Sequence, residues 1–210
     1  MTASPLLALP DYHRIYQVIY SVLEASEVAV THRACMFFAS AGALLLREHY
    51  GLQATISSGC MGLMVDEKAA NVVVYGRKEG GEFVYDSEGF HAWNECDGWM
   101  IDFMAPIMGV ALREDGKDIR VPRRMLQKRL VDGKSNLHAI QHLGEFYVAH
   151  DPSIAEALLD SQAALFGDLL HMCQTWFRKP PKPLKPLGMA DNHGMTKQLV
   201  LRAPSIDGVW

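Results

Sequence analysis

The sequence predicts an α+β fold, with helices first and an antiparallel sheet of about five strands after them. Up to residue 50, apolar side chains recur at the three- and four-residue spacing of helices. From residue 52 to 104, short runs of β-favouring residues alternate with turn-forming glycine and aspartate. The chain has 210 residues, of which 49% are hydrophobic, so it can build one large core and we treat 1–210 as a single domain.

The first helix is expected over 11–26, and the second from Thr31 to the residue before Gly51. Thr31 suits an N-cap, and Gly51 suits the left-handed position that follows a helix. The second helix is apolar nearly all round, which is typical of a helix enclosed by the rest of the fold, and Cys35 lies in its first turn. Its small residues allow another element to approach closely: Ala39, Gly42 and Ala43.

The strands that follow are expected to form an antiparallel meander. Turn-forming sequences separate them, which places each strand beside the next one along the chain. The expected strands are 52–65, 71–75, 82–85, 90–96 and 99–104.

Helices are expected to return after the sheet. The third of them opens on a capping box at Ser153, and its apolar stripe leaves a homodimer through this helix open. The segment 179–210 begins with a proline-rich run that must be extended, and 198–202 is expected to return as an edge strand. The three helices are expected over 123–130, 138–149 and 153–176.

A β-hairpin within residues 89–106 carries the most informative pattern. Its turn is Asp97-Gly98, which suits a two-residue type I′ turn because both central residues need φ above zero. This turn sets Cys96 opposite Trp99 and thereby determines the register of both strands.

The register places His91, Trp93 and Asp102 on one face of the hairpin. His91 and Asp102 become diagonal neighbours with Cβ atoms roughly 7 Å apart, a gap that a hydrogen bond between the side chains can close. Asp97 sits at the hairpin tip, roughly 20 Å along the strand from His91, and cannot reach it. We expect Asp102 to accept a hydrogen bond from Nδ1 of His91 and to leave Nε2 for a nucleophile.

The expected nucleophile is Cys35. A thiol in the first turn of a helix is exposed to the positive end of the helix dipole, which favours the thiolate. The free backbone N–H groups there could hold the oxyanion of a tetrahedral acyl intermediate. With His91 as the base and Asp102 as its orienting partner, these residues follow the logic of cysteine-dependent acyl transfer. The expected substrate is a small-molecule or peptide acyl compound, and no cofactor is expected.

These motifs resemble a known family. Cys35 on a helix, H-A-W-x-E at 91–95 and G-W-x-x-D at 98–102 together resemble the transglutaminase-like branch of the papain-like cysteine enzymes. Arylamine N-acetyltransferases are similar in the same way. The resemblance covers roughly 30–106 and implies a papain-like fold with Cys35 as the nucleophile. Met36 departs from the pattern, because many members of that family have tryptophan after the cysteine.

Three side chains are candidate walls of a substrate pocket: Trp93, Met36 and His32. His32 is also a rival base, since it lies one turn before Cys35. Trp93 could equally be a core residue.

Other interpretations stay open. Cys35 could be a small core residue, and His91 with Asp102 could tie two strands together without chemistry. The chain would then be a catalytically silent binding module. A zinc site built from His91, Cys96 and a further ligand is disfavoured, because the two side chains point to opposite faces of the strand.

Composition narrows the class of partner and compartment. The net charge of −4 predicts neither a nucleic acid nor an anionic membrane as partner. No apolar run reaches the roughly 18 residues of a spanning helix, and the first ten residues lack the features of a signal peptide. We therefore expect a cytoplasmic protein whose four scattered cysteines are free thiols, and no metal site.

Overall fold

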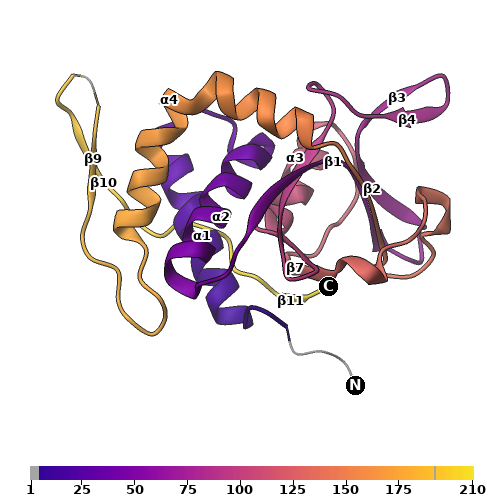
Figure 1. Cartoon of the computed structure of the whole chain (residues 1–210), viewed down its shortest axis with the longest axis horizontal. Helices are drawn as coiled ribbons and strands as arrows, with labels where there is room; N and C mark the ends of the chain where they lie inside the picture. The colour runs from indigo at the N-terminus through magenta and orange to yellow at the C-terminus, as the bar shows by residue number, and fades with distance from the viewer. Residues whose placement is uncertain (1–4, 192) are drawn as a thin grey trace.

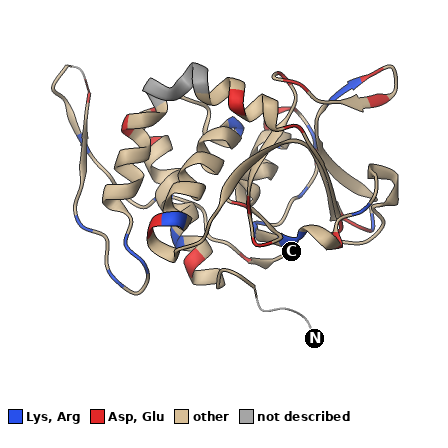
Figure 2. Cartoon of the chain, viewed as in Figure 1, with Lys and Arg blue, Asp and Glu red and all other residues tan. Residues whose placement is uncertain are grey.

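The structure is a computed structural model that describes residues 5–191 and 193–210, apart from the side chains of 160–165. Helices α1, α2 and α4 gather on one side of the molecule and the strands of the main sheet lie on the other (Figure 1). Acidic and basic residues are distributed over both parts (Figure 2). The α+β class predicted from the sequence is confirmed.

Both predicted N-terminal helices are present: α1 (Leu9–Ser26) and α2 (Cys35–Tyr50). The predicted N-cap at Thr31 is wrong, because residues Thr31–Arg33 form a short 3-10 helix, η1, and α2 begins only after it. The Thr31 hydroxyl donates to Glu24 Oε2 (2.7 Å) instead of capping α2. Gly51 ends α2 in the left-handed conformation, with a φ of 68°, as expected.

Within the described residues, seven strands form the main sheet: β1 (Thr55–Asp66), β2 (Asn71–Tyr75), β5 (His91–Cys96), β6 (Trp99–Asp102), β7 (Arg124–Arg129), β8 (Phe146–His150) and β11 (Gly208–Val209). Their order is β11-β7-β6-β5-β1-β2, and β8 also pairs with β1. Neighbours are antiparallel, except that β11 runs parallel to β7. Two small hairpins lie outside this sheet: β3 (Arg77–Glu79) with β4 (Glu82–Val84), and β9 (Gly188–Ala190) with β10 (Thr196–Gln198).

The predicted meander is wrong in its connections, because β1 is the centre of the sheet and not an edge. Its first part, up to Gly59, pairs with β5, while the part from Gly59 onward pairs with β8 and, from Met61, also with β2. Gly59 has a φ of 143°, and a Cβ atom there would lie only 3.0 Å from the backbone nitrogen of Asp151. Because Gly59 has no side chain, the long strand β1 can pair with β5 before this residue and with β8 after it.

The predicted hairpin is present with the predicted register. Asp97 and Gly98 have φ values of 49° and 76°, as a type I′ turn requires. Cys96 pairs with Trp99, and the ladder continues inward through two further pairs.

The helix predicted over 123–130 is strand β7, which pairs with β6 along four residues. Consecutive buried residues in its centre, from Met125 to Gln127, fit a strand that is covered on both faces. The helix predicted over 138–149 is also wrong. A short 3-10 helix, η4 (Leu137–Ala139), is followed by Gly144 at a φ of 78° and then by β8.

The long helix α4 runs over Pro152–Trp176. Its N-cap is Asp151 and not the predicted Ser153, because Asp151 Oδ1 accepts from the Ser153 backbone N–H (3.1 Å). The remaining short helices are η2 (Ala105–Ile107), α3 (Met108–Glu114) and η3 (Leu130–Asp132). No helix in the described part of the chain combines the length and apolar character needed to cross a membrane.

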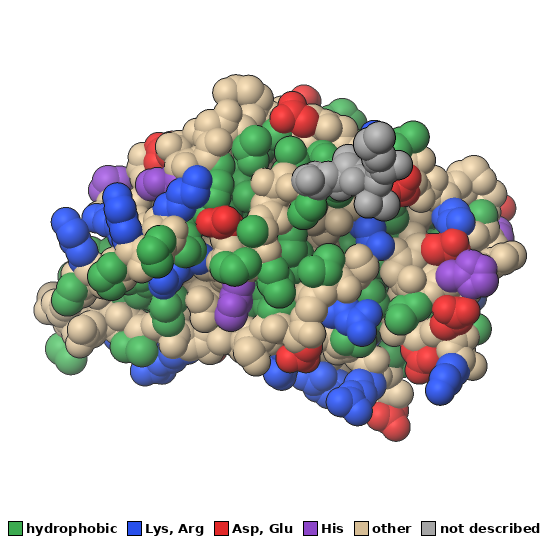
Figure 3. All heavy atoms as spheres, turned by 90° about the horizontal axis from the view of Figure 1, so that it is seen from below, with side chains coloured by type: hydrophobic (Ala, Val, Ile, Leu, Met, Phe, Trp, Pro, Cys, Tyr) green, Lys and Arg blue, Asp and Glu red, His purple; other side chains and the backbone are tan. Residues whose placement is uncertain are grey.

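The C-terminal arm, residues 179–210, lies along the rest of the chain. Trp176 donates its indole N–H to Lys185 O (3.0 Å), and Lys179 stacks over the Tyr50 ring at 4.4 Å. Figure 3 shows Lys and Arg side chains at the end of the molecule that carries β9 and β10 and also along the rest of this face. The edge strand predicted over 198–202 is wrong, because the main sheet receives β11 from this arm instead.

Two apolar cores lie on opposite faces of the hairpin β5–β6. The larger core joins α1, α2 and α4 to one face, and the smaller core contains Trp93 and Met100 on the other. Helix α2 lies unusually close to β5, because a Cβ atom at Gly42 would stand 2.6 Å from the Phe103 ring and would also overlap Asn94 Oδ1. Asn94 Nδ2 donates to Ala39 O (2.7 Å), which confirms the close approach predicted from the small residues of this helix.

Gly42→Ala should destabilise the protein by ~1–3 kcal/mol, because the new methyl group forces α2 away from β5. Gly167→Ala is the matched control, since Gly167 is an exposed residue within α4 with nothing near its Cβ position. That change should stabilise the helix by up to ~1 kcal/mol. Urea unfolding of both variants measures the two effects, and equal shifts would contradict the close packing described.

Candidate active site

Cys35 is the first residue of α2, a position at which backbone N–H groups have no partner within the helix itself. The N-cap, Ala34, makes no side-chain hydrogen bond to these groups. The first bond of the helix runs from Phe38 N to Ala34 O (3.1 Å), so the N–H groups of Cys35 and Met36 lie ahead of it. The predicted position of Cys35 in the first turn is confirmed.

His91 and Asp102 form a buried pair, with 2.8 Å between Nε2 of His91 and Oδ2 of Asp102. The side chains are 0% and 1% exposed. Asp102 Oδ1 accepts a second hydrogen bond from the Met104 backbone N–H (2.8 Å), and the Tyr12 hydroxyl donates to Asp102 O. Each oxygen of the carboxylate thus has a hydrogen-bond partner, as a buried charge requires.

The two ring nitrogens of His91 have the opposite roles to those predicted. Nε2, the nitrogen farther from the backbone, reaches Asp102, which lies at the end of β6. Nδ1 is buried and has no partner with full hydrogen-bond geometry among the described residues. Cys35 also interacts with this imidazole. The nitrogen available to the thiol is therefore Nδ1, because the carboxylate has taken the far one.

The electrostatic surroundings favour a protonated His91. Burial lowers the pKa of the imidazole, but the charge of Asp102, its hydrogen bond and the nearby Cys35 side chain together raise the pKa to about 10. The pair therefore holds a proton over the physiological range and can stabilise a negative charge on a neighbouring sulfur.

Tyr75 is a member of the site that the sequence did not reveal. Its ring stacks on His91 with centroids 4.1 Å apart and an interplanar angle of 18°. Trp93 stacks farther away, at 6.4 Å, and its indole N–H donates to Glu95 Oε1 (2.7 Å). Trp93 belongs to the smaller core and lines neither cavity beside Cys35, so Tyr75 takes the place predicted for it.

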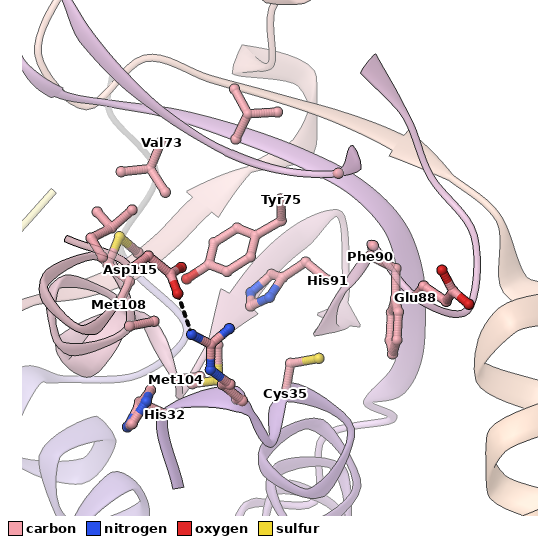
Figure 4. Close-up of a pocket in the computed structure, with 16 residues that line it drawn as sticks. His32, Cys35, Val73, Tyr75, Glu88, Phe90, His91, Met104, Met108 and Asp115 are labelled. Carbon is pink, nitrogen blue, oxygen red and sulfur yellow. Dashed lines mark hydrogen bonds and ion pairs between the residues drawn. The ribbon is translucent and has the colours of Figure 1, made fainter. Parts of the chain in front are cut away.

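Two cavities meet at Cys35. The first has a volume of about 360 Å³ and is lined by both Cys35 and His91; we call it the polar cavity because charged groups stand in its wall among apolar side chains. Figure 4 shows His91 above Cys35, with Tyr75 on one side and Phe90 on the other. Besides Cys35 and Tyr75, the charged and titratable groups of its wall are His32, Arg33, Glu88, His91 and Asp115.

The second, which we call the apolar cavity, has a volume of about 400 Å³ and is also lined by Cys35. Its wall includes Val28, Val30, Met36, Phe37, Phe90 and Phe166. Arg33, Cys35 and Phe90 line both cavities, so the thiol is shared by the cavity that holds most of the charged groups and the more apolar one.

The other predicted pocket residues do lie beside the site. Met36 lines the apolar cavity and His32 the polar one. His32 Nε2 is 2.7 Å from Glu114 Oε2, an ion-pair contact that turns it toward α3 and away from the role of rival base. Arg33 Nη2 binds Asp115 Oδ1 at 2.5 Å. These two pairs join η1, immediately before Cys35, to the end of α3.

Cys35 differs from the other cysteines in its surroundings. All four are free thiols. Burial raises the pKa of the Cys60, Cys96 and Cys173 thiols, which suits inert core residues. Cys35 is the cysteine that lines the two cavities. In the part of the chain that the structure describes, no three His, Cys, Asp or Glu side chains are grouped as a metal site would need.

The fold is shared with a solved protein of similar length. A crystal structure described as "The crystal structure of genomics APC5867" is 29% identical, with a TM-score of 0.82 over 99% of this chain and 98% of that chain. Residues 8–210 match the family "Protein of unknown function (DUF2026)", and the chain belongs to this family. No functionally curated protein matches the chain significantly.

The His91–Asp102 pair should make stability fall as the pH rises. The folded-state pKa of about 10 exceeds the ordinary histidine value of about 6.5, so the pair's contribution is complete below pH ~6.5 and is lost as the pH rises through ~10. Between pH 7 and 9 the loss should be on the order of 2 kcal/mol.

Urea midpoints of the wild type and of Asp102→Asn across this range isolate the contribution of the pair. The stability difference between the two proteins should shrink as the pH rises, because other titrating groups affect both alike. Asp97→Asn is the control and should follow the wild type, since asparagine also suits the type I′ turn. A pH-independent difference would mean that His91 is neutral in the folded protein.

Proposed function

We propose that this protein is a cysteine-dependent acyl-transfer enzyme, with Cys35 as the nucleophile, His91 as acid and base, and Asp102 as the orienting carboxylate. One observation carries the proposal. A thiol at an uncapped helix N-terminus lies beside a fully buried imidazole–carboxylate pair, and two cavities lead to it. A purely structural pair would need neither the thiol nor the open space next to it.

The chemistry follows from the geometry. The Cys35 thiolate attacks the carbonyl carbon of an amide, ester or thioester, and the new oxyanion is held by the backbone N–H groups of Cys35 and Met36. The bond to the leaving group then breaks as protonated His91 donates its Nδ1 proton to that group. The acyl group remains on Cys35 as a thioester. Neutral His91 next takes a proton from water or an amine as that group attacks the thioester, and the carbon–sulfur bond breaks to restore the Cys35 thiolate beside protonated His91.

The role of Asp102 is to hold the ring and to favour its protonated form. Asp102 accepts from Nε2, so the imidazole keeps Nδ1 directed to the thiol side. Tyr75 supports the same orientation by stacking on the ring. Such a carboxylate stabilises the imidazolium and need not itself take up the proton.

The wider resemblance supports the same proposal. A nucleophile at the start of a buried helix, followed in the chain by a histidine and an aspartate on neighbouring antiparallel strands, is the arrangement of the papain-like enzymes that the motifs resemble. We propose that the fold is papain-like in this sense. Whether water or an amine accepts the acyl group depends on the occupant of the polar cavity, so hydrolysis and transfer are both included in the proposal.

Cys35 should react with iodoacetamide at neutral pH much faster than the other three thiols. The reason is that protonated His91 and the helix N-terminus both favour a thiolate at this position. Peptide mass spectrometry after timed labelling gives the rate at each cysteine. Cys35→Ala should abolish the fast phase, whereas four equally slow thiols would favour a catalytically silent binding module.

Asp102→Asn should lower the reactivity of Cys35 by orders of magnitude, because the ring loses the charge that keeps it protonated and oriented. Asp97→Asn should leave the reactivity unchanged, since Asp97 lies in the turn at the tip of the hairpin. Labelling rates of the two variants at neutral pH decide the question. A harmful Asp97→Asn beside an inert Asp102→Asn would remove Asp102 from the proposed site.

A further inference from the structure

We infer that the apolar cavity beside Cys35 binds the acyl part of the substrate, and that this part is an uncharged aliphatic chain longer than acetyl. The inference rests on the proposed function and adds the substrate class to it. It is based on a difference between the two cavities that Cys35 lines: charged side chains stand mainly in the wall of one, and the wall of the other is largely apolar.

The leaving group belongs in the polar cavity. In the tetrahedral intermediate, the reacting carbon carries the Cys35 sulfur, the oxyanion, the leaving group and the acyl substituent. His91 must protonate the leaving group, and His91 lines the polar cavity but not the apolar one. The leaving group therefore lies in the polar cavity, and the oxyanion lies at the N-terminus of α2.

The acyl substituent is the remaining group on the reacting carbon. With the leaving group in the polar cavity and the oxyanion at the N-terminus of α2, the other space that Cys35 lines is the apolar cavity, and we place the acyl substituent there. Its volume of about 400 Å³ lies within the usual range of roughly 300–1,000 Å³ for small-molecule sites. A methyl group alone would leave most of this space unfilled.

The wall of the apolar cavity carries little charge. Among the described residues of its wall, Arg33 is the one charged side chain, and its guanidinium is bound to Asp115, which lines the polar cavity. The rest of the wall is largely aliphatic and aromatic, and Phe37 packs edge-on against Phe166 with centroids 5.5 Å apart. Such a wall stabilises methylene groups and disfavours a charge on the acyl chain.

The exposed apolar residues of the same segment fit this role. Val28 and Val30, in the loop that leads from α1 to η1, are 47% and 53% exposed and line the cavity. An apolar ligand in this cavity would cover both side chains. Its binding would explain why they are exposed near Cys35.

The test uses 4-nitrophenyl acetate, butyrate and hexanoate with the full-length protein. Nitrophenolate release gives the rate of acylation, and peptide mass spectrometry assigns the acyl group to Cys35. N-acetylcysteine provides the intrinsic reactivity of each ester. Relative to this reference, the rate constant should rise about fourfold for each added methylene, from ~0.8 kcal/mol per buried CH₂. The hemiglutarate ester, whose chain ends in a carboxylate, should gain nothing over acetate.

A pair of matched variants locates the effect. Val30→Glu puts a charge on the cavity wall and should lower the hexanoate-to-acetate ratio toward that of N-acetylcysteine. Val131→Glu makes the same change at an apolar residue that is 75% exposed and lines neither cavity, so the ratio should stay as in the wild type.

The outcomes separate the two proposals. If Cys35 reacts quickly with iodoacetamide but its acylation follows the reference at every chain length, the acyl-chain inference falls and the proposed function stands. The inference also falls if the two glutamate variants behave alike or if the acyl group is found elsewhere than on Cys35. If Cys35 is as slow as the other cysteines toward iodoacetamide, both proposals fall.

Discussion

The arrangement of this protein depends most on the close contact between α2 and β5. Gly42 presents no side chain at the point of contact, so the helix backbone lies against Asn94 and Phe103. Asn94 then donates to Ala39 O and joins the strand to the helix backbone. Because Cys35 begins this helix and His91 begins this strand, the contact determines where the thiol lies relative to the imidazole. The candidate site is therefore a consequence of how the core packs.

Asp102 connects this contact to the rest of the molecule. Its carboxylate binds His91 and the Met104 N–H, and its carbonyl oxygen accepts from Tyr12 on α1. Removing a carboxylate from water costs several kcal/mol unless such partners replace the water. Asp102, which orients the proposed base, thus also links α1, β5 and β6 by hydrogen bonds. The same hydrogen bonds therefore serve both the proposed chemistry and the stability of the fold.

The parts of the fold that were predicted well are those set by neighbouring residues. The hairpin register followed from Asp97-Gly98, because a two-residue turn leaves its strands one alignment. The predictions over 123–130 and 138–149 failed for the opposite reason. Strands β7 and β8 obtain their hydrogen bonds from β6 and β1, which lie far away in the sequence, and a helical pattern of apolar residues cannot reveal such partners.

The sequence by itself determined that Cys35 lies at the start of a buried helix and that His91 and Asp102 meet across a hairpin, because helix periodicity and strand alternation act over a few residues. The tertiary structure alone decided that Asp102 binds Nε2, that Tyr75 stacks on the ring, and that the thiol stands between a polar and an apolar cavity. These features depend on β1 bringing β2 and β5 into one sheet and on η1 being tied to α3. Contacts of that kind join segments that no short-range pattern relates.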